Sequence, residues 1–237
     1  MTVDGRGLLI VISGPSGAGK GTICKSFMDR NNNVALSVSA TTRDPRNGEV
    51  EGINYHFMSK DQFKEKIKAN DFLEYAEVYD NYYGTPKSNV EEILESGKDV
   101  ILEIDIQGAL KVKENTKEGV FIFILPPSME ELKQRIINRG SETQESLMKR
   151  FNSAYKEINF ISKYNYAVVN DKIEIAVEKL EAIISAEKCR VDRIKDSILD
   201  SKEGMTNEQL YDWTISGGFI GQNTWQIFFG NVNIKES

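Results

Sequence analysis

A glycine-rich stretch near the amino terminus decides the fold of this chain: Gly14-Pro15-Ser16-Gly17-Ala18-Gly19-Lys20-Gly21-Thr22. An apolar run at residues 8–13 precedes it, with the composition of a strand buried on both faces of a parallel sheet. A helical pattern follows to about residue 30. Glycines let successive backbone N–H groups point inward, and the helix that follows adds positive potential. The stretch therefore predicts a phosphate-binding loop, and its lysine argues against a simple linking turn.

The lysine and two acids suggest how this loop handles a nucleotide. Lys20 is placed to reach the β- and γ-phosphates of a bound nucleotide. The strict motif has Ser or Thr directly after the lysine, whereas this chain has Gly21 there and Thr22 one residue later. We expect the Mg²⁺ cofactor that accompanies the nucleotide to be held mainly by phosphates and water, with Thr22 and Asp105 as candidate metal ligands. An ordinary strand-end turn is the alternative for Asp105.

The rest of the chain alternates strand and helix patterns. Further apolar runs of the strand type lie at residues 34–39, 99–105, 120–125 and 166–169. Helical patterns lie between these runs at about 109–115, 128–139, 147–162 and 173–195. This order predicts the α/β fold of a P-loop NTPase, a doubly wound parallel sheet with helices on both faces.

Residues 40–97 depart from that alternation. Strand-like segments lie at 54–58, 72–79 and 82–83, and capping boxes at Ser59/Gln62 and Ser88/Glu91 predict two helix starts. We expect a small mixed α/β insertion here. The predicted division is therefore a core at 1–39, the insertion at 40–97, a core at 98–195 with a mobile lid at about 137–150, and an extension at 196–237.

Several motifs of the insertion, with the phosphate-binding loop, resemble the guanylate kinase family in order and in register. They are residues 37–46 (SVSATTRDPR), 48–49 (GE), 52–55 (GINY), 72–75 (FLEY), 82–85 (YYGT) and 104–108 (IDIQG). The resemblance covers about residues 8–193 and looks like the bacterial type. It implies a nucleoside monophosphate kinase of purine metabolism that transfers the γ-phosphoryl group of ATP to GMP.

The resemblance also implies two sets of site residues. The residues on the GMP side are Ser39, Arg43, Arg46, Tyr55, Glu74, Tyr83, Thr85, Glu103 and Asp105. Guanidinium forks suit a phosphate dianion, and a carboxylate suits the donor edge of guanine. Besides the residues of the loop at 14–22, the family pattern assigns Arg135 and Asn170 to ATP. The implied catalytic set is Lys20, Arg43, Arg139 and Arg150. Without the resemblance, Arg43 and Arg46 read equally well as a solvated turn.

Composition narrows the classes of partner and the cellular compartment that we expect. The 237 residues carry a formal charge of -6, which argues against nucleic-acid binding because that binding neutralises phosphates. The two cysteines and the absence of a long apolar run favour a cytoplasmic protein without a membrane segment. A monomer and a homodimer both stay open.

The sequence leaves two alternative functions open and one segment without an assigned role. A kinase for another nucleoside monophosphate is the first alternative, and a non-catalytic guanylate-kinase-like interaction domain is the second. The intact loop and Lys20 argue against the interaction domain, and Glu74 argues against another acceptor. The aromatic residues within 206–237 permit an added hairpin, a disordered extension or a partner contact.

Overall fold

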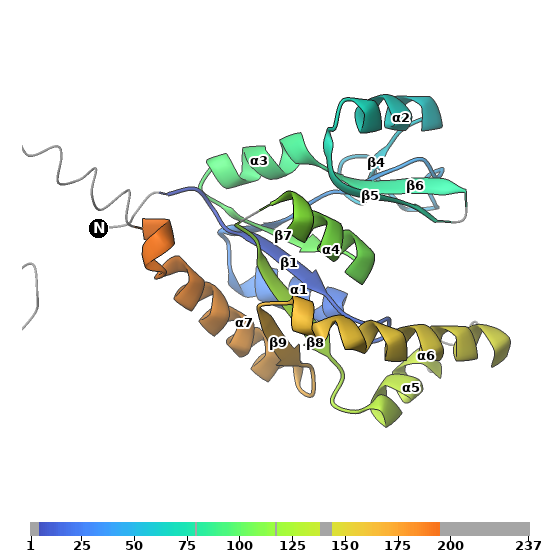
Figure 1. Ribbon diagram of the computed structural model, residues 1–237, viewed down its shortest axis with the longest axis vertical. Helices are drawn as coiled ribbons and strands as arrows, with labels where there is room; N and C mark the ends of the chain where they lie inside the picture. The colour runs from blue at the N-terminus through green and yellow to red at the C-terminus, as the bar shows by residue number, and fades with distance from the viewer. Residues whose placement is uncertain (1–4, 79, 117, 138–143, 195–237) are drawn as a thin grey trace, which may run out of the picture. The chain divides into compact units, whose positions relative to one another are not determined.

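The computed structural model describes residues 5–78, 80–116, 118–137 and 144–194, and for 78, 144–147, 149 and 150 it describes the backbone alone (Figure 1). The chain divides into two units, Met1–Arg190 and Val191–Ser237. Residues 191–194 at the start of the second unit are helical. All elements below belong to the first unit. The expected extension at 196–237 lies outside the described residues.

A five-stranded parallel sheet forms the centre of the first unit. Its order is β2 (Val34–Leu36), β7 (Asp99–Glu103), β1 (Leu9–Ser13), β8 (Val120–Leu125) and β9 (Tyr166–Val169). Ile10 pairs with Ile101 on one side and with Val120 on the other. Every residue of β1 is buried, which explains its continuous apolar sequence.

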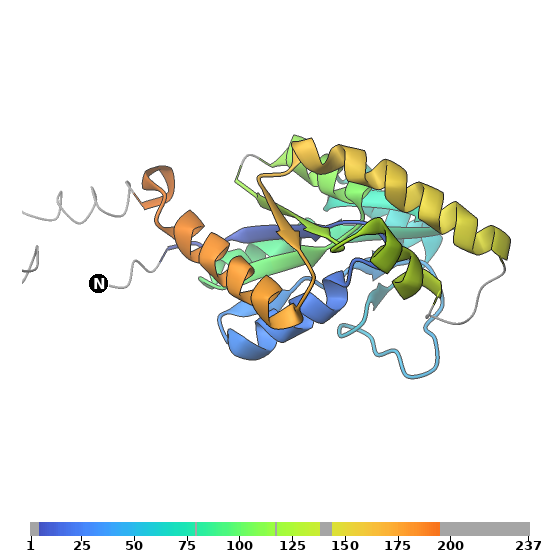
Figure 2. The same cartoon turned by 90° about the horizontal axis from the view of Figure 1, so that it is seen from below.

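Helices cover both faces of this sheet (Figure 2). Ile10 and Ile12 pack in a cluster with α1 (Lys20–Arg30) and α7 (Ile173–Lys188). Leu9 and Val11 point to the opposite face, where α3 (Lys87–Glu95) and α4 (Ile106–Asn115) pack. Alternate residues of one strand thus serve two cores, as a doubly wound sheet requires. The fold class expected from the sequence is confirmed.

The chain contains a second sheet of four strands. Its order is β4 (His56–Phe57), β3 (Ala40–Thr41), β6 (Asn81–Pro86) and β5 (Phe72–Val78). Helix α2 (Lys60–Lys68) packs on it through Phe63, whose ring centroid is 4.3 Å from that of Phe72. The capping box at its start is confirmed: Gln62 N donates to Ser59 Oγ at 3.2 Å, and Ser59 N donates to Gln62 Oε1 at 2.9 Å.

The remaining described elements follow β8. They are α5 (Met129–Ile137), α6 (Gln144–Ile158) and a 3-10 helix, η1 (Asn159–Lys163). Glu131 N donates to Ser128 Oγ at 3.0 Å, so the helix start expected there is confirmed. In α5 and α6, Leu132, Ile136 and Ala154 form one buried cluster.

Three expectations of local structure are wrong. The strand expected at 34–39 is shorter, because β2 of the parallel sheet ends at Leu36, residues 37–39 form no strand, and β3 of the second sheet begins at Ala40. The capping box at Ser88 is absent, because α3 already begins at Lys87 after Pro86 and has no side-chain cap. The helix expected at 109–115 begins at Ile106, because Asp105 caps its amino end.

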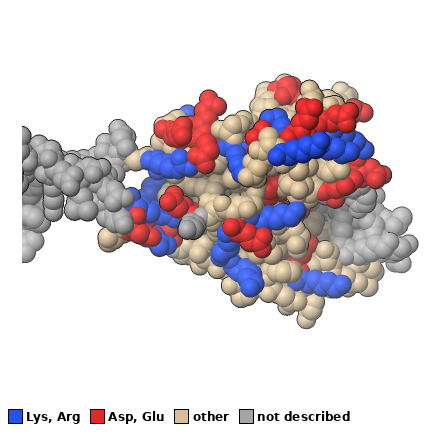
Figure 3. Space-filling view, turned by 45° about the horizontal axis from the view of Figure 1, so that its top comes forward, with Lys and Arg blue, Asp and Glu red and all other residues tan. Residues whose placement is uncertain are grey.

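The described part of the chain has mixed charges on the face in view and two free cysteines. On the face shown in Figure 3, acidic and basic side chains are interspersed over the described part of the chain. Cys24 is buried, Cys189 is exposed, and neither forms a disulfide. Among the helices that the structure describes, none has the length and apolar character needed to cross a membrane.

Candidate active site

The glycine-rich loop lies between β1 and α1, at the carboxyl edge of the parallel sheet. Gly14, Gly17 and Gly19 have φ values of 148°, 90° and 89°. These values lie in a region that residues with a Cβ rarely adopt, so the fold of the loop depends on its glycines. A Cβ on Gly17 would lie 3.1 Å from side-chain carbons of both Leu132 and Ile136, so α5 packs directly against the loop.

Lys20 is half-buried against this loop. Its Nζ donates to the carbonyl oxygen of Gly14 at 2.6 Å and to that of Pro15 at 3.3 Å. Burial lowers the pKa of Lys20, and the nearby carboxylates of Glu103, Glu157 and Asp105 oppose that shift. The ammonium group is therefore held at the loop by carbonyl groups and surrounded by acids.

Asn170, after β9, and Arg135 of α5 also hold the loop in place. The side chain of Asn170, which directly follows β9, donates from Nδ2 to the carbonyl oxygen of Ala18 at 2.8 Å. Arg135 donates from NH2 to the backbone oxygen of Asn170 at 3.2 Å and from Nε to Glu131 Oε1 at 3.0 Å. Arg135, Asn170 and the loop therefore form one connected group.

A cationic group lies beside the second sheet. The Arg43 guanidinium pairs with Glu49 Oε1 at 2.9 Å and lies over the Tyr55 ring, 5.5 Å from its centroid. The Tyr55 and Tyr83 rings are in contact, with centroids 6.1 Å apart, and Tyr83 also interacts with Arg43. Glu49 Oε2 accepts a hydrogen bond from the backbone N of Arg46 at 2.8 Å. Glu49 thus holds the arginine-bearing turn with both oxygens.

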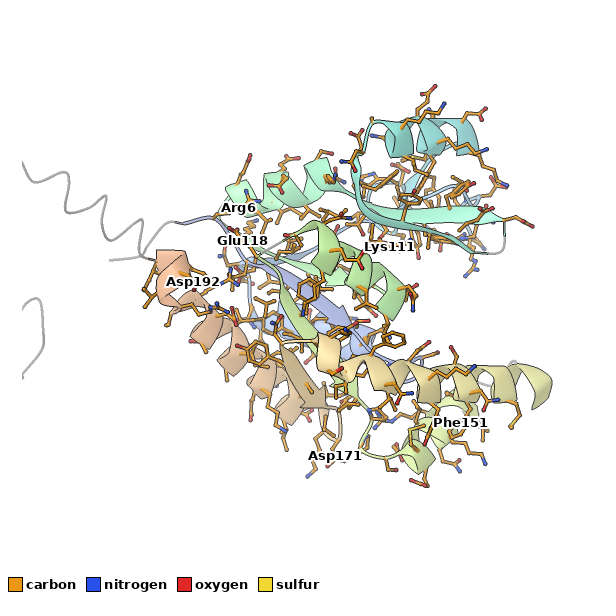
Figure 4. All side chains as sticks on the ribbon, in the orientation of Figure 1. Arg6, Lys111, Glu118, Phe151, Asp171 and Asp192 are labelled. Atoms are coloured by element: carbon orange, nitrogen blue, oxygen red, sulfur yellow. The ribbon has the colours of Figure 1, made fainter. Side chains whose placement is uncertain are left out.

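A buried carboxylate lies on β5, the edge strand of the second sheet, beside β6. Glu74 in β5 is 9% exposed, and its Oε1 accepts a hydrogen bond from Thr85 Oγ1 at 2.7 Å. Burial raises the pKa of Glu74, and Asp105 adds to the shift, while Thr85 and Lys111 oppose it. Lys111 of α4 extends to β5, where its Nζ donates to the carbonyl oxygen of Tyr75 at 2.5 Å (Figure 4).

Gly108 gives the Glu74 carboxylate its space. A Cβ on Gly108 would lie 3.0 Å from Glu74 Oε2 and 3.5 Å from Asp105 Oδ1. The backbone N of Gly108 donates to Asp105 Oδ1 at 2.7 Å, which fixes the start of α4. The first turn of α4 therefore places a hydrogen atom where any other residue would bring a carbon against the carboxylate.

Comparison with known proteins shows the family to which this chain belongs. The sequence model described as "Guanylate kinase" matches residues 6–187. The guanylate kinase of Clostridium tetani is 76% identical over 207 residues, which cover 87% of this chain and 99% of the relative. That of Clostridium acetobutylicum is 70% identical over 207 residues, with the same two coverages. The chain belongs to the guanylate kinase family.

A solved structure supports the same membership. The crystal structure of guanylate kinase from Anaplasma phagocytophilum superposes with a TM-score of 0.64 at 34% sequence identity. The superposition covers 79% of this chain and 89% of that one. The family resemblance and the fold expected from the sequence are both confirmed.

The structure of this guanylate kinase family member brings most of the predicted site residues into three groups. The loop residues gather with Lys20, Glu103, Arg135 and Asn170, while Arg43 gathers with Tyr55 and Tyr83, and Glu74 with Thr85 and Asp105. Arg46 and Thr22 are exposed, and Ser39 is half-buried at the crossing between the sheets. Arg139 lies outside the described residues, and for Arg150 only the backbone in α6 is described.

Four residues at these groups were missed as functional candidates. Glu49 and Gly108 lie within quoted motifs, but only their contacts to Arg43 and Glu74 indicate a role. Glu157 contributes negative charge at Lys20 although it lies 137 positions later in the sequence. Tyr164 packs edge-on against Phe123, and the charges of Asp105 and Glu157 act on its hydroxyl. Burial raises the pKa of that phenol to about 12. No sequence motif marks Glu157 or Tyr164.

Proposed function

We propose that the chain catalyses transfer of the γ-phosphoryl group of ATP to GMP, which yields ADP and GDP. The observation that carries this assignment is the buried Glu74 carboxylate, hydrogen-bonded by Thr85, in a chain that also has the P-loop with Lys20. Guanine presents N1–H and N2–H₂ donors on one edge, and an ionised carboxylate accepts both. Adenine has no such pair of donors on that edge, so AMP leaves the carboxylate unpaired.

In the proposed arrangement, each group has one task. The backbone N–H groups of the loop and Lys20 bind the phosphates of ATP. Arg43, Arg46, Tyr55 and Tyr83 bind the phosphate of GMP, and Ser39 assists Glu74 and Thr85 at the base. The acceptor phosphate is already an anion, so catalysis depends on alignment and on cations near the transferred group rather than on a general base. Arg139 and Arg150 would add cations from the segment at about 137–150.

The chain provides a fitting but incomplete set of ligands for Mg²⁺. Asp105 uses Oδ1 to cap α4, and its second oxygen would accept a hydrogen bond from a water of the ion. The Glu103 carboxylate would lie 3.3 Å from a Cβ on Gly21, so it occupies the side where the strict motif places a hydroxyl. Mg²⁺ usually keeps several waters and takes one or two carboxylates with substrate phosphates. We therefore assign Asp105, Glu103 and Thr22 to its outer surroundings, where the ion would neutralise charge on the phosphates.

We propose that different parts of the chain bind the two substrates. We assign residues 1–39 and 98–195 to ATP, residues 40–97 to GMP, and about 137–150 to a lid. The four strands of the second sheet lie between Ala40 and Pro86, which supports this assignment.

A panel of acceptors tests the function. Release of ADP from ATP and Mg²⁺ would be followed with GMP, AMP, CMP and UMP at equal concentrations. We expect turnover with GMP to exceed that with each other acceptor by at least about a thousandfold, as hydrogen-bonding sites achieve. Comparable turnover with AMP would contradict the role of Glu74, and turnover with none would contradict the enzyme itself.

The space at Gly108 leads to a selective prediction. Gly108→Ala places a carbon 3.0 Å from Glu74 Oε2, so the carboxylate has to move away from the guanine edge. We expect the KM for GMP to rise by about tenfold to a hundredfold while the KM for ATP changes little. Initial-rate kinetics with each substrate varied in turn measure both values. Gln107→Ala, at an exposed position on the same turn, is the control for raised helix propensity. An unchanged KM for GMP in Gly108→Ala would contradict the proposed contact.

The raised pKa of Glu74 predicts a pH dependence of GMP binding. Guanine requires the ionised carboxylate, so affinity falls as pH drops through the pKa of Glu74. Because burial raises that pKa, the loss begins at a higher pH than for an exposed glutamate. The phosphate of GMP also titrates near pH 6. Glu74→Gln separates the two effects, because the variant keeps only the phosphate contribution. Identical pH profiles for the dissociation constant of GMP in both proteins would contradict the prediction.

A further inference from the structure

The contacts of Asn170 connect three parts of the ATP side. Its backbone N donates to the carbonyl oxygen of Leu125 at the end of β8 at 2.8 Å. Its backbone oxygen accepts from Arg135 of α5, and its side-chain Nδ2 donates to the carbonyl oxygen of Ala18 in the loop. The residue is 4% exposed, so these contacts are shielded from water. Figure 4 labels Asp171, which follows it in the loop between β9 and α7.

The bond to Ala18 determines which way one peptide group of the loop faces. A trans peptide is planar, and its C=O and N–H point in opposite directions. The carbonyl of Ala18 shares its peptide group with the N–H of Gly19. Because Asn170 holds that carbonyl toward β9, the Gly19 N–H points the other way. A phosphate-binding loop works through N–H groups that are turned inward together, so the orientation of this peptide matters for the anion.

Gly19 is shaped to allow this contact. It has a φ of 89°, and a Cβ there would lie 2.3 Å from Asn170 Nδ2. Even a single methyl group would therefore displace the amide. The glycine serves both the turn of the loop and the close approach of Asn170.

We propose that Asn170 is a positioning residue for the P-loop, which orients the Ala18–Gly19 peptide for phosphate binding rather than reading the adenine of ATP. This inference rests on the proposed use of the loop for the phosphates of ATP. The side chain has one amide group, and its nitrogen already bonds the loop. Asn170 therefore supports binding of the phosphates by acting through the backbone, and Arg135 holds Asn170 in place from α5.

Binding of three probes to Asn170→Ala tests the inference. Calorimetry would measure the affinity for ADP, for inorganic pyrophosphate, which has no base, and for GMP. We expect ADP and pyrophosphate to bind more weakly by the same factor, between about tenfold and a hundredfold. We expect GMP affinity to stay within about twofold, because its proposed groups lie on the second sheet.

Asn165→Ala is the matched control. Asn165 precedes β9 at its other end, and its Oδ1 accepts a hydrogen bond from the backbone N of Phe121 at 2.9 Å. The variant loses one asparagine contact to a neighbouring strand without touching the loop. We expect its affinities for ADP and pyrophosphate to match those of the unaltered chain. Equal losses in both variants would reduce Asn170 to a general role in stability and overturn the inference.

The remaining outcomes are also decisive. Loss of ADP binding with unchanged pyrophosphate binding would mean that Asn170 reads the base, and unchanged binding of both would remove any role. If Asn170→Ala does not fold, NMR of the unaltered chain with bound ADP gives the answer. A scalar coupling between Asn170 Nδ2 and the Ala18 carbonyl is expected there, and its disappearance on ADP binding would overturn the inference. Failure of the unaltered chain to bind GMP would instead refute the proposed function.

Discussion

Replacing Lys20 by alanine is expected to lower kcat for GMP phosphorylation by at least about a thousandfold. The ammonium group lies on the loop carbonyls of Gly14 and Pro15, beside the proposed path of the transferred phosphoryl group. It would compensate the negative charge that shifts toward the leaving ADP, and no other loop side chain carries a cation. Single-turnover kinetics at saturating ATP and GMP would separate this chemical defect from weaker binding.

Lys25→Ala is the control for Lys20→Ala. Lys25 is exposed on the same helix, α1, five residues further on. Its loss alters the net charge by the same amount but removes no contact to the loop. Activity close to that of the unaltered chain is expected. A Lys20 variant that retained more than about a tenth of the rate would contradict the proposed role, because one charge-stabilising donor is ordinarily worth at least a hundredfold.

Replacing Glu74 by glutamine is expected to reduce kcat/KM for GMP by about a hundredfold to a thousandfold. The amide retains one oxygen for the Thr85 hydroxyl, but its NH₂ group opposes the donor edge of guanine. The mismatch leaves donors facing each other in a buried site, where unpaired polar groups are costly. Affinity for ADP should be unchanged, since the loop is not altered.

Glu77→Gln tests whether the loss in Glu74→Gln is specific. Glu77 is exposed on the same strand, β5, and pairs with Tyr82 across the sheet. Its substitution removes the same charge without reaching the buried carboxylate. Initial-rate kinetics with GMP should show no more than a small change. A Glu74 variant with kinetics like those of Glu77→Gln would exclude the carboxylate as the base reader.

The parts of the fold that the sequence predicted are those set by local pattern. The buried run before Gly14 specifies β1, the capping box at Ser59 specifies α2, and the runs at 120–125 and 166–169 give β8 and β9 with their exact bounds. Each depends on residues close in sequence. Strand and helix periods, turn glycines and caps are local signals, so they survive without knowledge of the tertiary structure.

One missed feature depends on tertiary strand pairing, and another on two cap signals that lie close together in the sequence. The apolar residues at 34–39 gave no sign that the chain changes sheets between Leu36 and Ala40. Ser88 has the right spacing for a cap, but Pro86 takes the N-cap position and α3 begins at Lys87, two residues earlier than a cap at Ser88 predicts.

The candidate site, too, was predicted from the sequence only in part. Motifs identified Lys20, Arg43 and Glu74, because charged residues in a recognisable pattern suggest chemistry. The supporting contacts join distant positions, such as Asn170 to Ala18 and Gly108 to Glu74. A glycine needed for space and an amide that holds a backbone carbonyl carry no charge pattern that marks them in a single sequence.

Phosphorus NMR of a mixture of the unaltered chain, ATP, Mg²⁺ and GMP tests the central claim most directly. The account predicts that the signals of ATP and GMP decline together while those of ADP and GDP appear in equal amounts. The β-phosphorus of the new GDP should carry any isotope label placed on the γ-phosphate of ATP. Formation of inorganic phosphate in place of GDP, or no change in either nucleotide, would contradict the account.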